Sequence, residues 1–298
     1  MKKVTASILA LLVSACSENS NVTTSKPTSV DTVNSSIKEL SPLGQKPPDL
    51  TPKPFAPGLV STNGFETQAA FAPNMREFYY LGQAPGEKSK RYVVRYEDGV
   101  WRKSVMEFTS GVFISTDGNT MHAGGEYRER THTGWSDKKK MGAPFDEIPI
   151  MVLTASNAET YFFDERTEIG TIRTSRLVDG VREAPEALGE NINTGKYTAH
   201  PFIAPDESYL IFDSEREGGY GDNDLYISFR QQDASWGPAI NMGKDINTEY
   251  GDSHGSVTPD GNYFFFSSRK LGEGVTESDL SIFWVDAQII ENLRDENK

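Results

Sequence analysis

The chain has 298 residues and an acidic balance, with 43 Asp and Glu against 30 Lys and Arg and a net charge of −13. No basic patch alternates with aromatic residues, so the composition disfavours binding to a nucleic-acid backbone, and an anionic bilayer surface would repel the folded part. The length that remains after the N-terminal segments suits one all-β domain or two ordinary ones.

The N-terminus has the parts of a secretory signal. Residues 1–3 are cationic, residues 4–13 form an apolar run too short to span a bilayer as a helix, and the small pair Ser14-Ala15 follows. This pair directly before Cys16 resembles the lipobox of bacterial lipoproteins. The resemblance implies a signal peptide over residues 1–15, lipidation of Cys16 and, because Ser17 rather than Asp follows, an outer-membrane location.

Cys16 is the only cysteine of the chain, and an unpaired thiol is unusual in an oxidising compartment. We therefore expect a lipid anchor at Cys16, with an ordinary cleaved signal and an incidental thiol as the alternative. Residues 16–54 are rich in Ser, Thr, Asn, Pro and Lys, which predicts a flexible linker that cannot bury enough surface to fold. The linker would tether a domain at residues 55–298, which we expect to face the periplasm.

Two long segments repeat at a spacing of 54 residues. "LGENINTGKYTAHPFIAPDESYLIFDSER" begins at Leu188, and "MGKDINTEYGDSHGSVTPDGNYFFFSSR" begins at Met242. Three fainter copies precede them, and the five copies share one turn position, at Pro73, Thr116, Ser156, Pro205 and Pro259.

Each copy predicts a four-stranded unit: an extended run, a turn of Pro-Asp-Gly type, an aromatic strand, a further strand and a short last strand. A period of about 40 to 55 residues with four short strands is typical of a propeller blade. We therefore expect an all-β fold, a β-propeller of five blades, with six blades as the alternative if residues 120–150 hold a degenerate one. The turns "DGVW", "DGVR" and "DASW" are expected before the last strand of their blades.

The segments "TPDGNYFFFSSR" and "APDESYLIFDSER" resemble the repeat of TolB-type, WD40-like propellers, over about residues 58–286. The family includes binding proteins, protein-interaction platforms and a few enzymes, so the resemblance specifies the fold more than the function. "FAPGLVST", which starts at Phe55, matches the lead-in of the later repeats and is expected to supply the last strand of the C-terminal blade. No amphipathic helix is predicted before the tail "AQIIENLR".

Two further sets of residues are candidate ligands. Asp224 and Asp279 precede equivalent strands, and we interpret them as buried acceptors of backbone N–H groups rather than as calcium ligands, because they recur with the blade. Arg166, Arg216 and Arg269 follow the second strands of three blades. They would either form a ring of carboxylate or phosphate binders or pair with neighbouring acids such as Asp164 and Glu215.

Gln68, His200 and His254 occupy one repeat position, five residues before the turn prolines. The strand that leads into this turn is innermost in a propeller, so these side chains are predicted to surround the channel mouth on three consecutive blades. They would converge on a divalent cation or another polar ligand, by analogy with a metal lyase of the wider propeller group. The alternative is that each histidine only hydrogen-bonds to its neighbouring blade, and no other cofactor is expected.

The sequence contains no nucleophile elbow, Gly-rich phosphate loop or zinc-binding helix. The favoured hypothesis is therefore a non-catalytic envelope lipoprotein whose propeller binds a protein or glycan partner. The alternative is a polysaccharide-active hydrolase or lyase that acts at the mouth of the channel.

Overall fold

A computed structural model describes residues 41–297, except residues 63, 109, 168–169 and 270–279. The predicted signal peptide, Cys16, most of the predicted linker and Asp279 lie outside the described residues. The described part is almost entirely β-structure, with one α-helix, α1 (Gln288–Glu296), and two 3-10 turns, η1 (Pro42–Gly44) and η2 (Phe145–Glu147). Within it, no helix combines the length and the hydropathy that crossing a bilayer would require.

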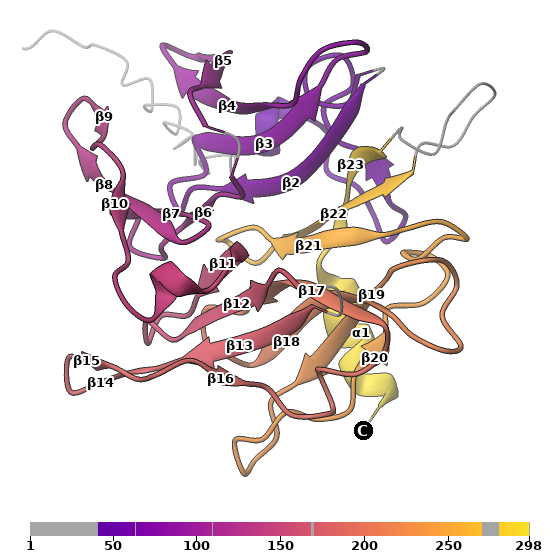
Figure 1. The fold of residues 1–298 in the computed structure, drawn as a ribbon. Helices are drawn as coiled ribbons and strands as arrows, with labels where there is room; N and C mark the ends of the chain where they lie inside the picture. The colour runs from indigo at the N-terminus through magenta and orange to yellow at the C-terminus, as the bar shows by residue number, and fades with distance from the viewer. Residues whose placement is uncertain (1–40, 63, 109, 168–169, 270–279, 298) are drawn as a thin grey trace, which may run out of the picture. The chain divides into compact units, whose positions relative to one another are not determined.

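Five antiparallel sheets surround a common centre and form a five-bladed β-propeller, as the repeat predicted (Figure 1). The first blade is built from β2 (Phe65–Phe71), β3 (Glu77–Gln83), β4 (Lys90–Glu97) and β5 (Val100–Met106). The second comprises β6 (Phe113–Ile114), β7 (Thr120–Ala123), β8 (Glu126–Thr131), β9 (Gly134–Trp135) and β10 (Lys139–Lys140). The third comprises β11 (Ile150–Ala155), β12 (Tyr161–Glu165), β13 (Thr171–Ser175) and β16 (Glu186–Ala187).

The last two blades contain the strongest repeats. The fourth blade has the order β17 (Tyr197–Ile203), β18 (Tyr209–Glu215), β19 (Asp224–Phe229) and β20 (Ile240–Asn241). The fifth has the order β21 (Ser253–Val257), β22 (Tyr263–Arg269), β23 (Leu280–Asp286) and β1 (Lys53–Pro54). The aromatic strands β18 and β22 are buried along nearly their whole length, because neighbouring blades cover both of their faces.

The alternative of six blades is not realised. Residues 120–140 supply the outer strands of the second blade, and η2 lies on the connection to the third. The second blade looked degenerate in sequence because its innermost strand, β6, has only two residues.

The N-terminal segment closes the ring, although its strand, β1, lies directly before "FAPGLVST" and not within it. Lys53 pairs with Trp284 in the antiparallel contact of β1 with β23, and the N–H of Phe55 donates to the carbonyl of Ile282 at 2.8 Å. The ring of Phe55 is fully buried between the first and fifth blades, and its centroid lies 4.7 Å from that of Phe265. The first and last parts of the chain therefore share one hydrophobic cluster.

The linker differs from the expectation at its C-terminal end. Residues 41–54 were predicted to belong to it, yet Pro42 and Pro48 are buried and Leu43 packs against the cluster around Phe55. The N–H of Asp286 donates to the carbonyl of Asp49 at 3.1 Å. This stretch is ordered because it covers the outer edge of the fifth blade, so the folded part extends at least to residue 41.

The turns expected before the last strands also differ in part. Asp98 and Gly99 connect β4 to β5 as predicted, with the positive φ values of a tight hairpin turn. In the third blade, however, Asp179 and Gly180 close a separate hairpin of β14 (Leu177–Val178) and β15 (Val181–Arg182), and the last strand follows later. The prediction was wrong there because an Asp-Gly pair favours a tight turn in any hairpin, including one whose strands are not part of the blade sheet.

The "INT" lead-in of the strong repeats has a structural explanation. The side chain of Asn193 accepts from the N–H of Ile172 at 2.8 Å and donates to its carbonyl at 2.9 Å. Asn247 makes the same pair of bonds with Leu225 at 2.8 and 3.0 Å. Each asparagine therefore hydrogen-bonds to backbone N–H and C=O groups on the third strand of the preceding blade. The last strand of that blade is too short to pair with these groups.

Candidate functional site

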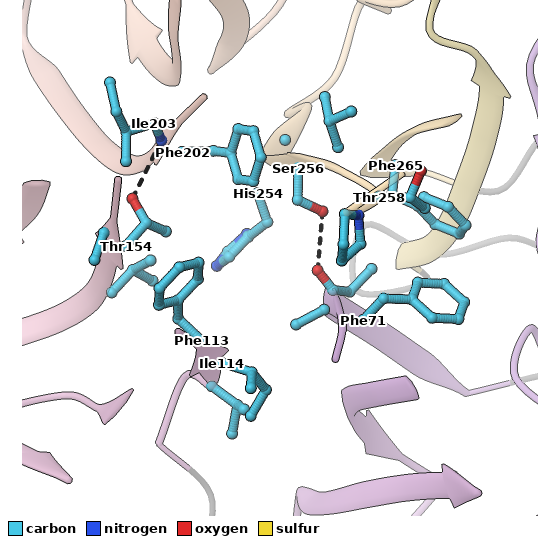
Figure 2. A pocket seen from close by; sticks show the side chains of 18 of the residues that line it. Phe71, Phe113, Ile114, Thr154, Phe202, Ile203, His254, Ser256, Thr258 and Phe265 are labelled. Carbon is cyan, nitrogen blue, oxygen red and sulfur yellow. Dashed lines mark hydrogen bonds between the residues drawn. The ribbon is translucent and has the colours of Figure 1, made fainter. Parts of the chain in front are cut away.

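A cavity of about 300 Å³ lies on the propeller axis, lined by the innermost strands of all five blades (Figure 2). Most of its lining side chains are apolar, and they include Phe71, Phe113, Ile114, Phe202 and Phe265. The five turn positions of the repeat, or their immediate neighbours, line one end, which we call the cavity mouth: Pro73, Thr116, Asn157, Pro205 and Pro259. The polar side chains of Gln68, His200 and His254 line the other end, which we call the cavity floor.

The floor residues occupy β-bulges in an unusual backbone conformation. The strand register shifts at Gln68 in β2, at His200 in β17 and at His254 in β21. All three have positive φ, of 60°, 51° and 54°, which costs a non-glycine residue roughly 1 kcal/mol. A bulge re-aims the side chain at its position, and here it turns three polar groups toward the channel.

The first part of the floor is a chain of hydrogen bonds from one blade to the next. A terminal nitrogen of Arg91 on β4 donates to Oε1 of Gln68, and Nε2 of Gln68 lies 3.2 Å from Nε2 of His254. The other ring nitrogen of His254, Nδ1, lies 2.9 Å from the hydroxyl of Ser253. Burial lowers the pKa of Arg91 to about 9, which still leaves it charged at neutral pH.

The second part is an ion pair beneath the neighbouring histidine. Nδ1 of His200 lies 2.7 Å from Oδ1 of Asp213, and the rings of His200 and His254 stack with centroids 3.6 Å apart. Burial alone would lower the pKa of His200, but the Asp213 carboxylate outweighs it and the pKa is raised. Burial, together with the charges of His200 and Arg91, holds the pKa of His254 well below its ordinary value. The two stacked rings therefore have opposite protonation preferences.

Two buried acids hold the bulges in place. Asp213 accepts the backbone N–H of His254 at 3.1 Å, and Asp164 accepts that of His200 at 3.0 Å. Asp164 also accepts the N–H groups of Met151 and Val152, at 3.1 and 2.8 Å. Each acid therefore fixes the bulge of the next blade. Oδ2 of Asp213 has no hydrogen-bond partner among the described residues.

The structure brings Gln68, His200 and His254 together on consecutive blades, but at the cavity floor and not at the mouth, where they were predicted. His200, Asp213 and His254 offer three ligand atoms that all lie within 4.8 Å of one another. The rings stack at an interplanar angle of 24°, so their in-plane lone pairs run side by side and do not converge. A divalent ion would need one ring to rotate and would face the charge of Arg91, so the donor set fits a metal poorly, and the metal site stays a prediction.

The other candidates lie away from the cavity. Arg216 donates to the carbonyl of Ile192 and lies over the Tyr226 ring at 4.7 Å, while Glu215, its predicted partner, contacts Lys196 instead. Arg269 lies over the ring of Tyr250 at 3.9 Å, and Arg166 is exposed. The three arginines do not line the cavity.

Asp224 matches the structural interpretation. Its carboxylate accepts the backbone N–H groups of Tyr220 and Gly221, at 2.7 and 3.2 Å, and the amide of Asn241 at 2.8 Å. These bonds close the loop that precedes β19, so the acid serves the loop as a structural acceptor.

No family model matches the chain, and no curated protein matches it. Among solved structures, the chain is similar to TolB from Acinetobacter baumannii, with 13% identity and a TM-score of 0.46 over 74% of this chain and 54% of that one. The chain thus spans about half of that protein. It is also similar to a thermostable family-43 glycoside hydrolase, with 13% identity and a TM-score of 0.47 over 76% of this chain and 90% of that one.

A third similar structure is the NanB sialidase of Streptococcus pneumoniae, with 13% identity and a TM-score of 0.37 over 67% of this chain and 36% of that one. TolB, whose repeat the sequence resembles, is thus among the similar structures. At these values no likeness bears on ligand or activity. The β-propeller class rests on the sheets of the chain itself.

Proposed function

We propose that this chain is a lipid-anchored protein of the bacterial outer membrane whose propeller is a non-catalytic binding module in the periplasm. The axial cavity is its ligand site, and the partner is an envelope protein or glycan that presents a small, largely apolar group. The observation that carries this proposal is the cavity itself, because all five blades contribute to one apolar pocket with a polar floor. Apolar walls with a few convergent polar groups are typical of ligand sites.

A polysaccharide-active enzyme is the alternative function. Most glycoside hydrolases need two carboxylates on either side of the scissile bond. None of the described residues that line the cavity is an Asp or Glu. The lining therefore favours binding over glycoside hydrolysis at this site.

Photo-crosslinking in native membranes tests the binding function. A crosslinking residue at Thr116, which is exposed at the cavity mouth, should capture one defined partner, whereas the same residue at Val178 on the β14–β15 hairpin should not. The variant Ala70→Phe narrows the cavity and should abolish capture without a loss of folding. Equal capture by the narrowed variant would contradict the cavity as the site.

The anchor has its own test. Cys16→Ser should remove fatty-acid labelling and release the protein from the membrane fraction, or leave it as an uncleaved precursor. A variant that still fractionates as an acylated membrane protein would show that Cys16 is not the lipidated residue.

A further inference from the structure

We propose that the axial cavity binds an apolar ligand that ends in a carboxylate, with the head group held at the floor by the N–H groups of His200 and Gln68. This inference rests on the proposed binding function and names the class of ligand. It follows from the protonation and orientation of each polar group at the floor.

Arg91 sets the orientation of the Gln68 amide. An arginine side chain has only donors, so the atom of Gln68 that it contacts must be the carbonyl oxygen Oε1. The NH₂ group of Gln68 then faces Nε2 of His254 at 3.2 Å. One of its two hydrogens is used in that bond, and the second remains to be donated at the cavity floor.

The same bond sets the tautomer of His254. Nε2 accepts from Gln68 and is therefore unprotonated, so the proton of this ring lies on Nδ1 and is donated to Ser253. Both nitrogens of His254 are thus occupied, and the ring offers the ligand only its edge and its face. Its neutral state agrees with its strongly lowered pKa.

His200 supplies the second donor. Its Nδ1–H is donated to Asp213, and no described residue hydrogen-bonds to its Nε2. Because His200 lines the cavity, protonation of Nε2 presents an N–H to whatever occupies the floor. The raised pKa of His200 favours that protonated form.

The acids of this region do not face the ligand. Asp213 and Asp164 are nearly completely buried, accept bonds from the bulges, and are not part of the cavity lining. The floor thus presents N–H donors, with the charge of Arg91 behind them, under apolar walls. Among the described side chains of the floor, no carboxylate faces a cation, whereas a carboxylate ligand receives two N–H groups and leaves its apolar body against the phenylalanines.

An apolar carboxylate has two natural sources, a free fatty acid and the C-terminal residue of a peptide. Calorimetry at pH 6.5 distinguishes the two sources with two pairs of ligands. The first pair is decanoate and decan-1-ol. The second pair is a short peptide that ends in phenylalanine, once with a free C-terminal carboxylate and once with a C-terminal amide. We expect the acid of at least one pair to bind about tenfold or more tightly than its neutral partner. A preference within the peptide pair identifies a protein C-terminus as the source, in agreement with a protein partner, whereas a preference within the decanoate pair replaces that partner by a fatty acid.

A matched pair of variants tests the floor. Gln68→Glu keeps the size of the side chain and its contact with Arg91 but replaces a donor by an anion, so affinity for the acid should fall about tenfold or more, and affinity for the neutral ligand should not. Asn157→Asp makes the same change at the exposed mouth and should have little effect. Equal loss in both variants would overturn the inference.

A pH titration of the wild type keeps the test independent of variants. The groups that face His200 are Asp213, Asp164 and the neutral ring of His254, and the raised pKa of His200 means that its proton is lost above its ordinary range. The pKa of Arg91, about 9, sets the upper limit of the titration, because the charge behind the floor is lost there. Affinity for the acid should fall as pH rises from 6 to 8, and affinity for the neutral ligand should stay constant. If the acid and neutral ligands bind equally, the carboxylate inference is overturned. If none of the four ligands binds, the proposed function of the cavity is itself overturned.

Discussion

His200 and His254 stack face to face, with ring centroids 3.6 Å apart, although 54 residues separate them in the chain. They occupy the same repeat position on adjacent blades, and both have positive φ in a β-bulge. The two rings nevertheless differ in chemistry, because only His200 has a carboxylate on its Nδ1. A repeated position has thus produced two imidazoles with opposite protonation preferences.

The charge on His200 predicts a pH-dependent effect of Asp213→Asn. A raised folded-state pKa stabilises the protein fully below the ordinary pKa of about 6.5, and this contribution is lost as pH rises through the folded pKa. We expect the variant to lower the free energy of unfolding by about 2 kcal/mol at pH 5.5, and by progressively less toward pH 8.5. Urea unfolding across this range measures the difference.

Asp245→Asn is the control for this experiment, since Asp245 is exposed in a loop of the same part of the chain. It should change stability by less than about 0.5 kcal/mol at every pH. A loss in Asp213→Asn that is the same at all pH values would show that the carboxylate acts through packing and not through the charge of His200.

The stacked rings also predict the response to metal. Because their lone pairs do not converge, we expect zinc and manganese to leave the melting temperature of the wild type unchanged. Thermal unfolding with and without metal, and metal analysis of protein purified without chelator, measure this. A rise in melting temperature that disappears in His200→Ala/His254→Ala would instead establish the metal site.

The repeat explains which parts of the site could be predicted from sequence. The repeat predicted the blades and the phase of their innermost strands, and Gln68, His200 and His254, which share one repeat position, lie together in the structure. Asp213 was missed because its register positions in the first and fifth blades are Leu81 and Ser267. A comparison of repeats finds the residues that the blades share, and an acid occurs at this register position in only one of these three blades. Asp213 therefore could not be found in this way.

Arg91 and the N-terminal segment were missed for a different reason. Arg91 lies on the third strand of its blade, and nothing in "KRYVVRYE" indicates that this arginine is fully buried while its neighbours are not. Residues 41–54 have the composition of a linker, yet Leu43 packs against a cluster that includes Phe265 and Trp284, which are distant in the sequence. The composition of a segment indicates how much apolar surface it can bury by itself. It does not show which surface of the folded domain the segment will cover.

A third prediction concerns His122 in the second blade. It is buried against Tyr161, and its Nδ1 has no hydrogen-bond partner among the described residues. Burial, and secondarily the charge of Arg182, lowers its pKa to about 4, so the folded protein loses stability as pH falls below about 6.5. His122→Phe should remove this loss, on the order of 3 kcal/mol near pH 4, and leave stability at pH 8 equal or slightly higher.

Unfolding free energies of the wild type and His122→Phe at pH 4 to 8 measure this effect. His132 is exposed and serves as the control position, where His132→Phe should not change the pH dependence. Parallel curves for the wild type and His122→Phe would contradict the assignment of the acid-sensitive group.

A fourth prediction concerns Phe55, whose ring lies between the first and fifth blades. Phe55→Ala should lower the free energy of unfolding by about 3–5 kcal/mol, because the ring is fully buried among other aromatic side chains that cannot collapse into the space. Guanidinium chloride unfolding measures the shift in midpoint. Leu50→Ala, at a position that is 49% exposed, should cost less than about 0.5 kcal/mol, and equal losses in the two variants would contradict the role of Phe55 in closing the ring.

The last prediction concerns the segment that precedes Phe55. A chain that begins at residue 41 keeps β1 and its pairing with β23, whereas a chain that begins at residue 55 exposes the backbone of β23 as an open edge. We expect the longer chain to unfold in one transition, and the shorter to melt at a lower temperature and to aggregate, as calorimetry and light scattering would show. In the longer chain, Asp49→Ala/Lys53→Ala removes an exposed ion pair of 3.7 Å and an exposed hydrogen bond of 3.0 Å from the N–H of Thr51 to Oδ1 of Asp49. It should change the melting temperature little, because the segment stabilises the blade through backbone hydrogen bonds and buried prolines. Equal melting temperatures for the two chain lengths would mean that the blade closes without its fourth strand.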